Sequence, residues 1–133
     1  MAWIAPVTDR VLADVTNKTA KGVANVVDFN RVENNTSELA TLLYVTITTK
    51  TDWANTDIPT EVHQTRIVDN AQDCVDAYYV LPDTPNIPAV PVNTYTKWNA
   101  LEQNLYDLYY MYVSNLPDLY LGEMYVGESI GTI

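Results

Sequence analysis

Residues of the types that catalyse reactions or ligate metals are few in this chain of 133 residues. His63 is its one histidine and Cys74 its one cysteine. A catalytic histidine requires a nucleophile or a second base held beside it, and the sequence signals none around His63. No basic neighbour lowers the pKa of the Cys74 thiol, and a single cysteine forms neither an internal disulfide nor a zinc cluster. We therefore predict a packed or surface histidine and a buried thiol that packs as a small apolar group.

The acidic residues form pairs, but none of the pairs has the spacing of a known ligand set. Asp52 with Asp57 and Glu33 with Glu38 lack the spacing of a calcium-binding loop, and the sequence has no glycine-rich phosphate loop. Glu33 and Glu102 stand at one position of an internal repeat. Two explanations remain for them: a paired catalytic role, or, as we favour, hydrogen bonds that fix neighbouring helices or caps. The sequence thus predicts that the protein is not an enzyme and has no catalytic, cofactor-binding or metal-binding residues.

The net charge bears on the class of partner. Seventeen acidic and seven basic residues give a net charge of −10. Such a surface repels phosphate backbones, so we expect no direct binding to nucleic acid. Two explanations remain for the charge: solubility, which we favour because the acidic residues are scattered, or an acidic face that meets a basic protein. No apolar stretch approaches the roughly 18 residues that span a membrane, and the first residues lack the pattern of a secretory signal. We expect a soluble protein made in a reducing cytoplasm, without membrane insertion.

The elements that must position these residues form a weak internal repeat. Residues 29–35 read Phe-Asn-Arg-Val-Glu-Asn-Asn, and residues 98–104 read Trp-Asn-Ala-Leu-Glu-Gln-Asn. A fainter middle copy has Arg66-Ile67 and Asn70 at the corresponding positions. The second copy follows the first by 35 residues, and the third follows the second by 34.

Each copy has the apolar periodicity of an amphipathic helix. Apolar or small residues recur at alternating steps of three and four, which places them on one stripe. The sequence therefore predicts an all-α bundle of three principal helices. A shorter N-terminal helix is expected to begin near Thr8 and to stop at Gly22, and Asp28 is the expected N-cap of the first principal helix. The stripes consist of Phe29, Val32, Thr36, Leu39 and Leu43 in the first copy, Gln64, Ile67, Ala71, Cys74 and Tyr78 in the second, and Trp98, Leu101, Leu105, Leu108 and Tyr112 in the third.

The connections between the helices differ in character, although we predict one domain over residues 1–133. Residues 44–49 are rich in β-branched side chains, so we expect minor β structure near Val45. Residues 81–95 contain four prolines at intervals of three residues, the period of a polyproline II helix. Such a stiff connection can return the chain along a helix and allow parallel neighbours. Residues 116–133 contain three glycines and are expected to form an extended or strand-like tail that pairs near Val45 or offers an edge to another chain.

The third predicted helix is apolar beyond its main stripe. Such a helix is either central in the fold, which we favour, or carries an interface. For its extra tyrosines and those of the tail, three explanations remain: an interface, a core or shielded surface, or stacking on glycans. The interface candidates are Tyr106, Tyr110, Val113, Tyr120 and Tyr125.

Several short runs stand out by their order and spacing along the chain. They are Trp3-Ile4, Pro6–Arg10, Ala13–Val15, Asp28–Asn34, Thr49–Trp53, Asp57–Thr60, Asp118–Tyr120 and Gly122-Glu123. Together these runs resemble a poorly characterised group of small proteins and tail-protein modules from phages and prophages of Gram-positive bacteria. The resemblance extends from about Trp3 to Glu128. It implies a virion or tail-associated role, and the group supplies no catalytic residues.

We therefore expect a phage tail or virion-associated structural protein without catalytic activity. We expect it to form a homo-oligomer, a complex with other virion proteins, or both. It would occupy the host cytoplasm during assembly and the virion afterwards. The first alternative is a free acidic phage protein that inhibits a basic host factor, such as a nucleic-acid-handling defence protein. The second alternative is a module that binds host-surface glycans.

Overall fold

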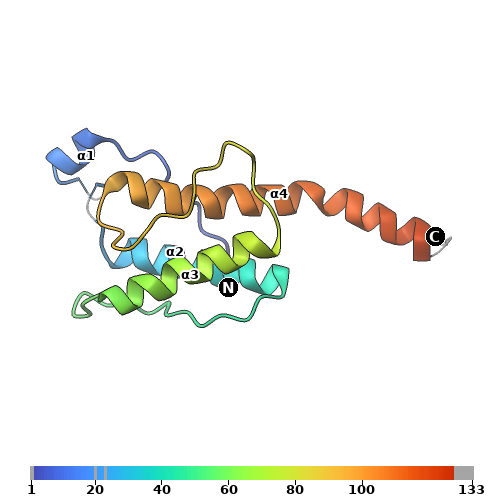
Figure 1. Ribbon diagram of the computed structural model, residues 1–133, viewed down its shortest axis with the longest axis horizontal. Helices are drawn as coiled ribbons and strands as arrows, with labels where there is room; N and C mark the ends of the chain where they lie inside the picture. The colour runs from blue at the N-terminus through green and yellow to red at the C-terminus, as the bar shows by residue number, and fades with distance from the viewer. Residues whose placement is uncertain (1, 20, 23, 128–133) are drawn as a thin grey trace.

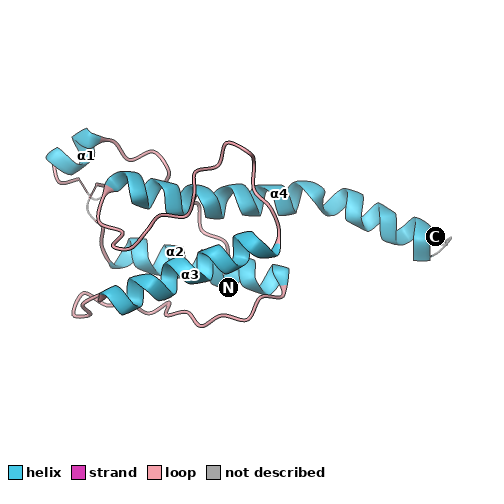
Figure 2. Cartoon of the chain, viewed as in Figure 1, coloured by secondary structure: helices cyan, strands magenta, loops and turns pink. Residues whose placement is uncertain are grey.

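The computed structural model describes residues 2–19, 21, 22 and 24–127, and over residues 116–127 it describes the backbone alone. Within these ranges the chain forms the helices α1 (Leu12–Thr16), α2 (Val26–Leu43), α3 (Glu61–Ala77) and α4 (Tyr95–Gly127), and no strand. The three long helices all pack against one another, as Figures 1 and 2 show. The predicted all-α bundle of three principal helices and a short N-terminal helix is therefore confirmed.

The three long helices run in the same direction. We call the part of the molecule in which α2, α3 and α4 pack together the body. Figure 1 shows the three helices beginning at one end of the body, while the connections 44–60 and 78–94 return the chain along it. Both connections are long, because a short loop can join only antiparallel neighbours. The parallel course that the proline-rich connection allows is thus the one that the chain adopts.

The sequence repeat is also a structural repeat. The three long helices begin at residues 26, 61 and 95, which are separated by the same 35 and 34 residues as the sequence motifs. Corresponding stripe positions face the common core: Leu39, Cys74 and Leu108 occupy one repeat position and are all 0% exposed. α2, α3 and α4 therefore surround the core as three approximately equivalent units.

The core consists mainly of the predicted stripes. Val32, Ile67 and Leu101 form one buried layer, and Phe29 meets Trp98 edge-on with ring centroids 5.1 Å apart. Gln64 replaces an aromatic residue at the equivalent position of α3, and its side-chain oxygen accepts a hydrogen bond from Val92 N at 2.8 Å. Trp53 from the α2–α3 connection fills part of the space beside Phe29.

The strand predicted near Val45 is absent from the described structure. Val45 and Ile47 pack against the core, but their neighbours bond to helix side chains and not to another strand. Asn70 Nδ2 donates to the Thr48 carbonyl at 2.7 Å, and the Lys50 amide donates to Glu33 at 2.9 Å. Because α2 and α3 supply partners for this backbone, the segment stays extended without joining a sheet.

The tail prediction is wrong over residues 116–127, and residues 128–133 lie outside the described residues. α4 continues to Gly127, so this stretch is helical, not extended. A helix satisfies its backbone groups internally, whereas an extended tail requires a second strand, and none is described. Gly122 lies inside this helix, where a glycine costs about 1 kcal/mol relative to alanine.

Two local predictions at the N-terminal side also need correction. α1 spans only Leu12–Thr16, and Gly22 lies beyond its end, where a Cβ atom would collide with the backbone of Asp14. The N-cap of α2 is Asn25, whose side chain accepts from the Val27 amide at 2.9 Å. Asp28 stands three residues further on and accepts from the Asn25 amide at 3.1 Å, which completes a capping box.

Candidate functional site

A buried ion cluster joins the N-terminal segment to α2 and α4. Glu102 accepts from Arg10 Nη2 at 2.6 Å and from Arg31 Nε at 2.7 Å and Nη2 at 2.6 Å. Asp28 is the second carboxylate, 3.3 Å from Arg10 Nη2. The side chains of all four residues are at most 8% exposed. Two guanidinium groups therefore face two carboxylates, and the charges inside the cluster balance.

Further hydrogen bonds join this cluster to the backbone. Arg10 also donates from Nε to the Lys21 carbonyl at 3.0 Å and from Nη1 to the Val7 carbonyl at 2.8 Å. Burial lowers the pKa of Arg31, but its bonds to Glu102 and Asp28 outweigh that effect and raise the pKa overall. Each charged group of the cluster thus faces a partner of opposite charge within the protein, and the cluster leaves no free base or nucleophile.

Glu33 forms a second ion cluster between α2 and α3. Its carboxylate accepts from Arg66 Nη2 at 2.6 Å, from the Lys50 amide at 2.9 Å, and from the Trp53 indole. Glu33 is 1% exposed, whereas the Arg66 side chain is 27% exposed. The Nε atom of Arg66 is buried without a hydrogen-bond partner, in contrast to that of Arg31.

The two clusters are copies of one arrangement. In each, a glutamate of one unit pairs with the arginine at the equivalent position of the next helix: Glu33 with Arg66, and Glu102 with Arg31. We call each such pair an Arg–Glu latch. The third latch would join α3 to α4, but Val68 and Ala100 stand at its two positions. The favoured explanation for Glu33 and Glu102, hydrogen bonds that fix neighbouring helices, agrees with this geometry.

Asparagines at repeated positions bind the extended segments between the helices. Asn30 accepts from the Trp53 amide at 2.7 Å and donates to its carbonyl at 3.1 Å. Asn99, at the same repeat position, accepts from the Arg10 amide at 3.1 Å and donates to its carbonyl at 2.8 Å. Asn35 does the same for Ile4 at 2.9 and 2.7 Å. The polar groups of the body are therefore used mainly to hold its own chain.

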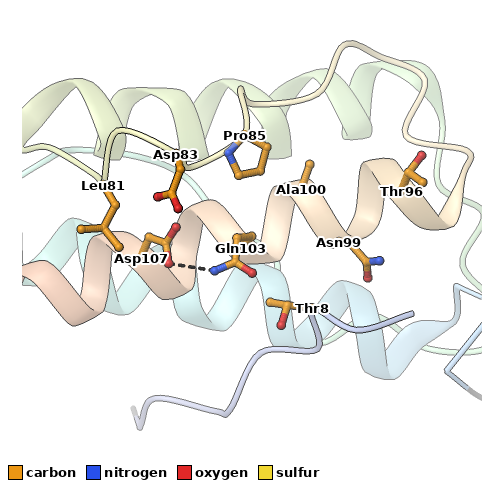
Figure 3. Close-up of a pocket in the computed structure, with 9 residues that line it drawn as sticks. All are labelled: Thr8, Leu81, Asp83, Pro85, Thr96, Asn99, Ala100, Gln103 and Asp107. Carbon is orange, nitrogen blue, oxygen red and sulfur yellow. Dashed lines mark hydrogen bonds between the residues drawn. The ribbon is translucent and has the colours of Figure 1, made fainter. Parts of the chain in front are cut away.

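A cavity of about 560 Å³ lies on the outer side of α4 (Figure 3). Asp107 is its buried acid, and both of its oxygens are engaged, by Gln103 at 2.8 Å and by Thr84. Asn99 lines the cavity but uses its amide on Arg10. Asp83 is exposed at the rim, so no second carboxylate is held against Asp107. The cavity thus lacks a paired acid and base. Its lining comprises Thr8, Leu81, Asp83, Pro85, Thr96, Asn99, Ala100, Gln103 and Asp107.

His63 and Cys74 occupy the places expected of them. His63 belongs to the first turn of α3, where its Nδ1 atom accepts from the Thr60 amide at 3.0 Å and its ring meets Trp53 edge-on. Cys74 is 0% exposed, and burial, aided by the charge of Asp73, raises the pKa of its thiol to about 11. His63, predicted to be a packed or surface histidine, is half-buried against Trp53, and the predicted buried thiol of Cys74 is confirmed.

The interface candidates divide into two groups. Tyr106, Tyr110 and Val113 are 47%, 48% and 41% exposed on α4, and the first two rings lie 6.4 Å apart. Tyr120 and Tyr125 belong to the part of α4 described by its backbone alone. Tyr109 stacks on Trp3 with ring centroids 4.0 Å apart, so this tyrosine packs within the body.

Arg10 is the functional-site residue that sequence reasoning missed. Its partners Asp28 and Glu102 are 18 and 92 residues away, and no local pattern marks it as buried. Among the described residues, no group of three histidine, cysteine, aspartate or glutamate side chains could hold a metal ion. None of the helices in the described ranges has the length and apolarity needed to cross a membrane. Comparison of the chain with family models, curated proteins and solved structures finds no match.

Proposed function

We propose that this protein is a structural component of a phage tail or virion, without catalytic activity, and that it assembles through α4. The observation that carries the proposal is the continuation of α4 beyond the body. By the repeat, Leu43 at the end of α2 corresponds to Tyr112, yet α4 extends to Gly127. We call residues 113–127 the arm. Figure 1 shows it projecting away from α2 and α3.

An isolated helix of this length is marginally stable in water, because most helix stability in proteins comes from packing of an apolar face. Eight of the fifteen arm residues are apolar and two are charged. The exposed Tyr106, Tyr110 and Val113 lead from the body into the arm. A helix with this composition that projects from the body supports a role in assembly, either with a second copy or with another virion protein.

The test is a double variant, Tyr106→Ala with Tyr110→Ala. Interface tyrosines often cost 2 kcal/mol or more when truncated, so we expect assembly to weaken by about tenfold or more. Both rings are half exposed, so the thermal stability of the body should change little. Light scattering over a concentration series, with and without the neighbouring virion proteins, measures assembly, and immunoblotting of purified phage particles measures incorporation.

The matched control is Val27→Ala with Val62→Ala, which removes exposed apolar side chains from α2 and α3. It should assemble like the wild type. A wild-type protein that forms no assembly at high concentration and is absent from purified particles would refute the proposal. Strongly salt-sensitive binding to a basic host protein would then favour the free acidic inhibitor.

A further inference from the structure

We infer that the arm, together with the end of the body from which it leaves, binds a basic and apolar surface of another protein in preference to a second copy of this chain. The inference rests on the proposed assembly role and names the chemistry of the partner. Three observations carry it: the distribution of charge along the body, the shared direction of the helices, and the exposed apolar side chains beside the arm.

The basic residues are unevenly distributed along the sequence. Residues 1–66 contain six basic and eight acidic residues, whereas residues 67–133 contain one basic and nine acidic residues. Arg10, Arg31 and Arg66 are committed to the internal ion clusters. Lys97 lies in the first turn of α4, at the end opposite the arm, and no basic residue follows it. The second half of α4, the arm included, therefore carries acidic charge alone.

Acidic residues recur toward the end from which the arm leaves. Glu38, Asp73 and Asp107 share one repeat position in the second halves of α2 and α3 and along α4. Asp76 follows in the last turn of α3, and Asp118 and Glu123 belong to the arm. Because the three helices are parallel, α2 and α3 end here and their carbonyl ends add partial negative charge. The whole end of the molecule is thus negative.

The same end offers apolar contact surface. Tyr79 at the end of α3 is 47% exposed, close to the exposures of Tyr106 and Tyr110. Tyrosine rings accept arginine and lysine groups on their faces, and truncation of such aromatic contacts is often costly. A second copy brought arm to arm would place two negative ends together, whereas a basic groove with aliphatic walls complements both the charge and the apolar surface.

The experiment uses the full chain and a synthetic probe, a fluorescently labelled amphipathic helical peptide made of leucine and lysine. A leucine–glutamate peptide and a serine–lysine peptide of equal length are the comparison probes. Fluorescence anisotropy should show binding of the leucine–lysine peptide alone, weakened by added salt. The variant Asp118→Asn with Glu123→Gln should weaken that binding by about three- to tenfold, as expected for the loss of two charge contacts.

A control variant removes the same charge from the other end of the body. Asp9→Asn with Glu61→Gln should change the affinity less than twofold. Asp9 precedes α1 and Glu61 begins α3, and Figure 1 shows α1 and the start of α3 at the end of the body opposite the arm. Equal weakening by the two variants would overturn the location of the site. If the serine–lysine peptide binds as tightly as the leucine–lysine peptide, the partner surface need not be apolar and that part of the inference is wrong. Sedimentation showing a homo-oligomer that Tyr106→Ala with Tyr110→Ala abolishes would make a second copy the occupant and overturn the inference.

Failure of this inference is distinguishable from failure of the proposed function. A protein that is present in purified particles but does not bind the leucine–lysine peptide keeps its assembly role and loses the basic partner. A protein that binds the peptide through the arm but is absent from particles keeps the basic partner and loses the virion role.

Discussion

The α2–α4 interface and the α3–α4 interface use equivalent positions of the repeat, but different interactions hold them together. In the first, Glu102 accepts three hydrogen bonds from Arg31 and Arg10 in a buried site. In the second, the equivalent positions hold the apolar residues Val68 and Ala100. The same backbone arrangement therefore accepts either an ion pair or two apolar side chains at these positions, because neither choice leaves a buried polar group without a partner.

The largest expected effect comes from removing Glu102. Glu102→Ala leaves Arg10 and Arg31 buried against the single carboxylate of Asp28, and breaking such a buried pair costs about 3–5 kcal/mol. Glu33→Ala should cost less, about 1–3 kcal/mol, because the partly exposed Arg66 regains water. Urea unfolding of both variants gives the two free energies. The comparison fails if Glu33→Ala is the more damaging change.

The apolar core gives the next effect. Leu105 and Leu108 are both 0% exposed, so each change to alanine should cost about 2–5 kcal/mol. Cys74→Ala removes a single heavy atom at the repeat position of Leu108, so it should lower the free energy of unfolding by less, about 1 kcal/mol. Thermal unfolding measures all three. Losses below about half a kcal/mol for the leucines would mean that the core lies on another face of α4.

The missing Arg–Glu latch can be installed. Val68→Glu alone places an unpaired carboxylate in a buried position and should destabilise the protein, and Ala100→Arg alone should do so less, because Ala100 is only half buried. If the units are equivalent, the double variant should recover about 1–3 kcal/mol relative to the sum of the single changes. A double-mutant cycle in urea measures this coupling. Coupling near zero would show that the α3–α4 interface departs from the geometry of the α2–α3 and α2–α4 interfaces.

The smallest effect is expected in the proline-rich return connection. Pro82 and Pro85 are exposed, so replacing each with glycine chiefly raises the entropy of the unfolded chain. Each replacement should therefore lower the free energy of unfolding by about 0.4–1 kcal/mol. Asn86→Gly in the same connection is the control for the glycine itself. An unchanged melting temperature in the double proline variant would show that this connection is a loose linker and not a stiff strut.

The sequence alone determined the helical units. Their stripes, the repeat offsets and the buried positions of Leu105 and Leu108 follow from local periodicity, because an amphipathic helix must bury its apolar face whatever it packs against. The burial of Cys74 followed for the same reason, because this residue stands on the predicted stripe of its helix. The parallel course of the helices was permitted by the proline spacing but was selected by packing.

Only the tertiary structure decided the pairing of charges and the fate of the extended segments. Arg10 meets Glu102 across 92 residues, and no local pattern encodes such a distant contact. The β-branched residues near Val45 form no strand in the described chain, because Asn70 and Glu33 bind their neighbours' backbone groups. β propensity expresses fit to a sheet, and this body supplies helix side chains in place of a second strand. The arm was mistaken for an extended tail because its glycines suggest a break, whereas the helix continues from α4 to Gly127.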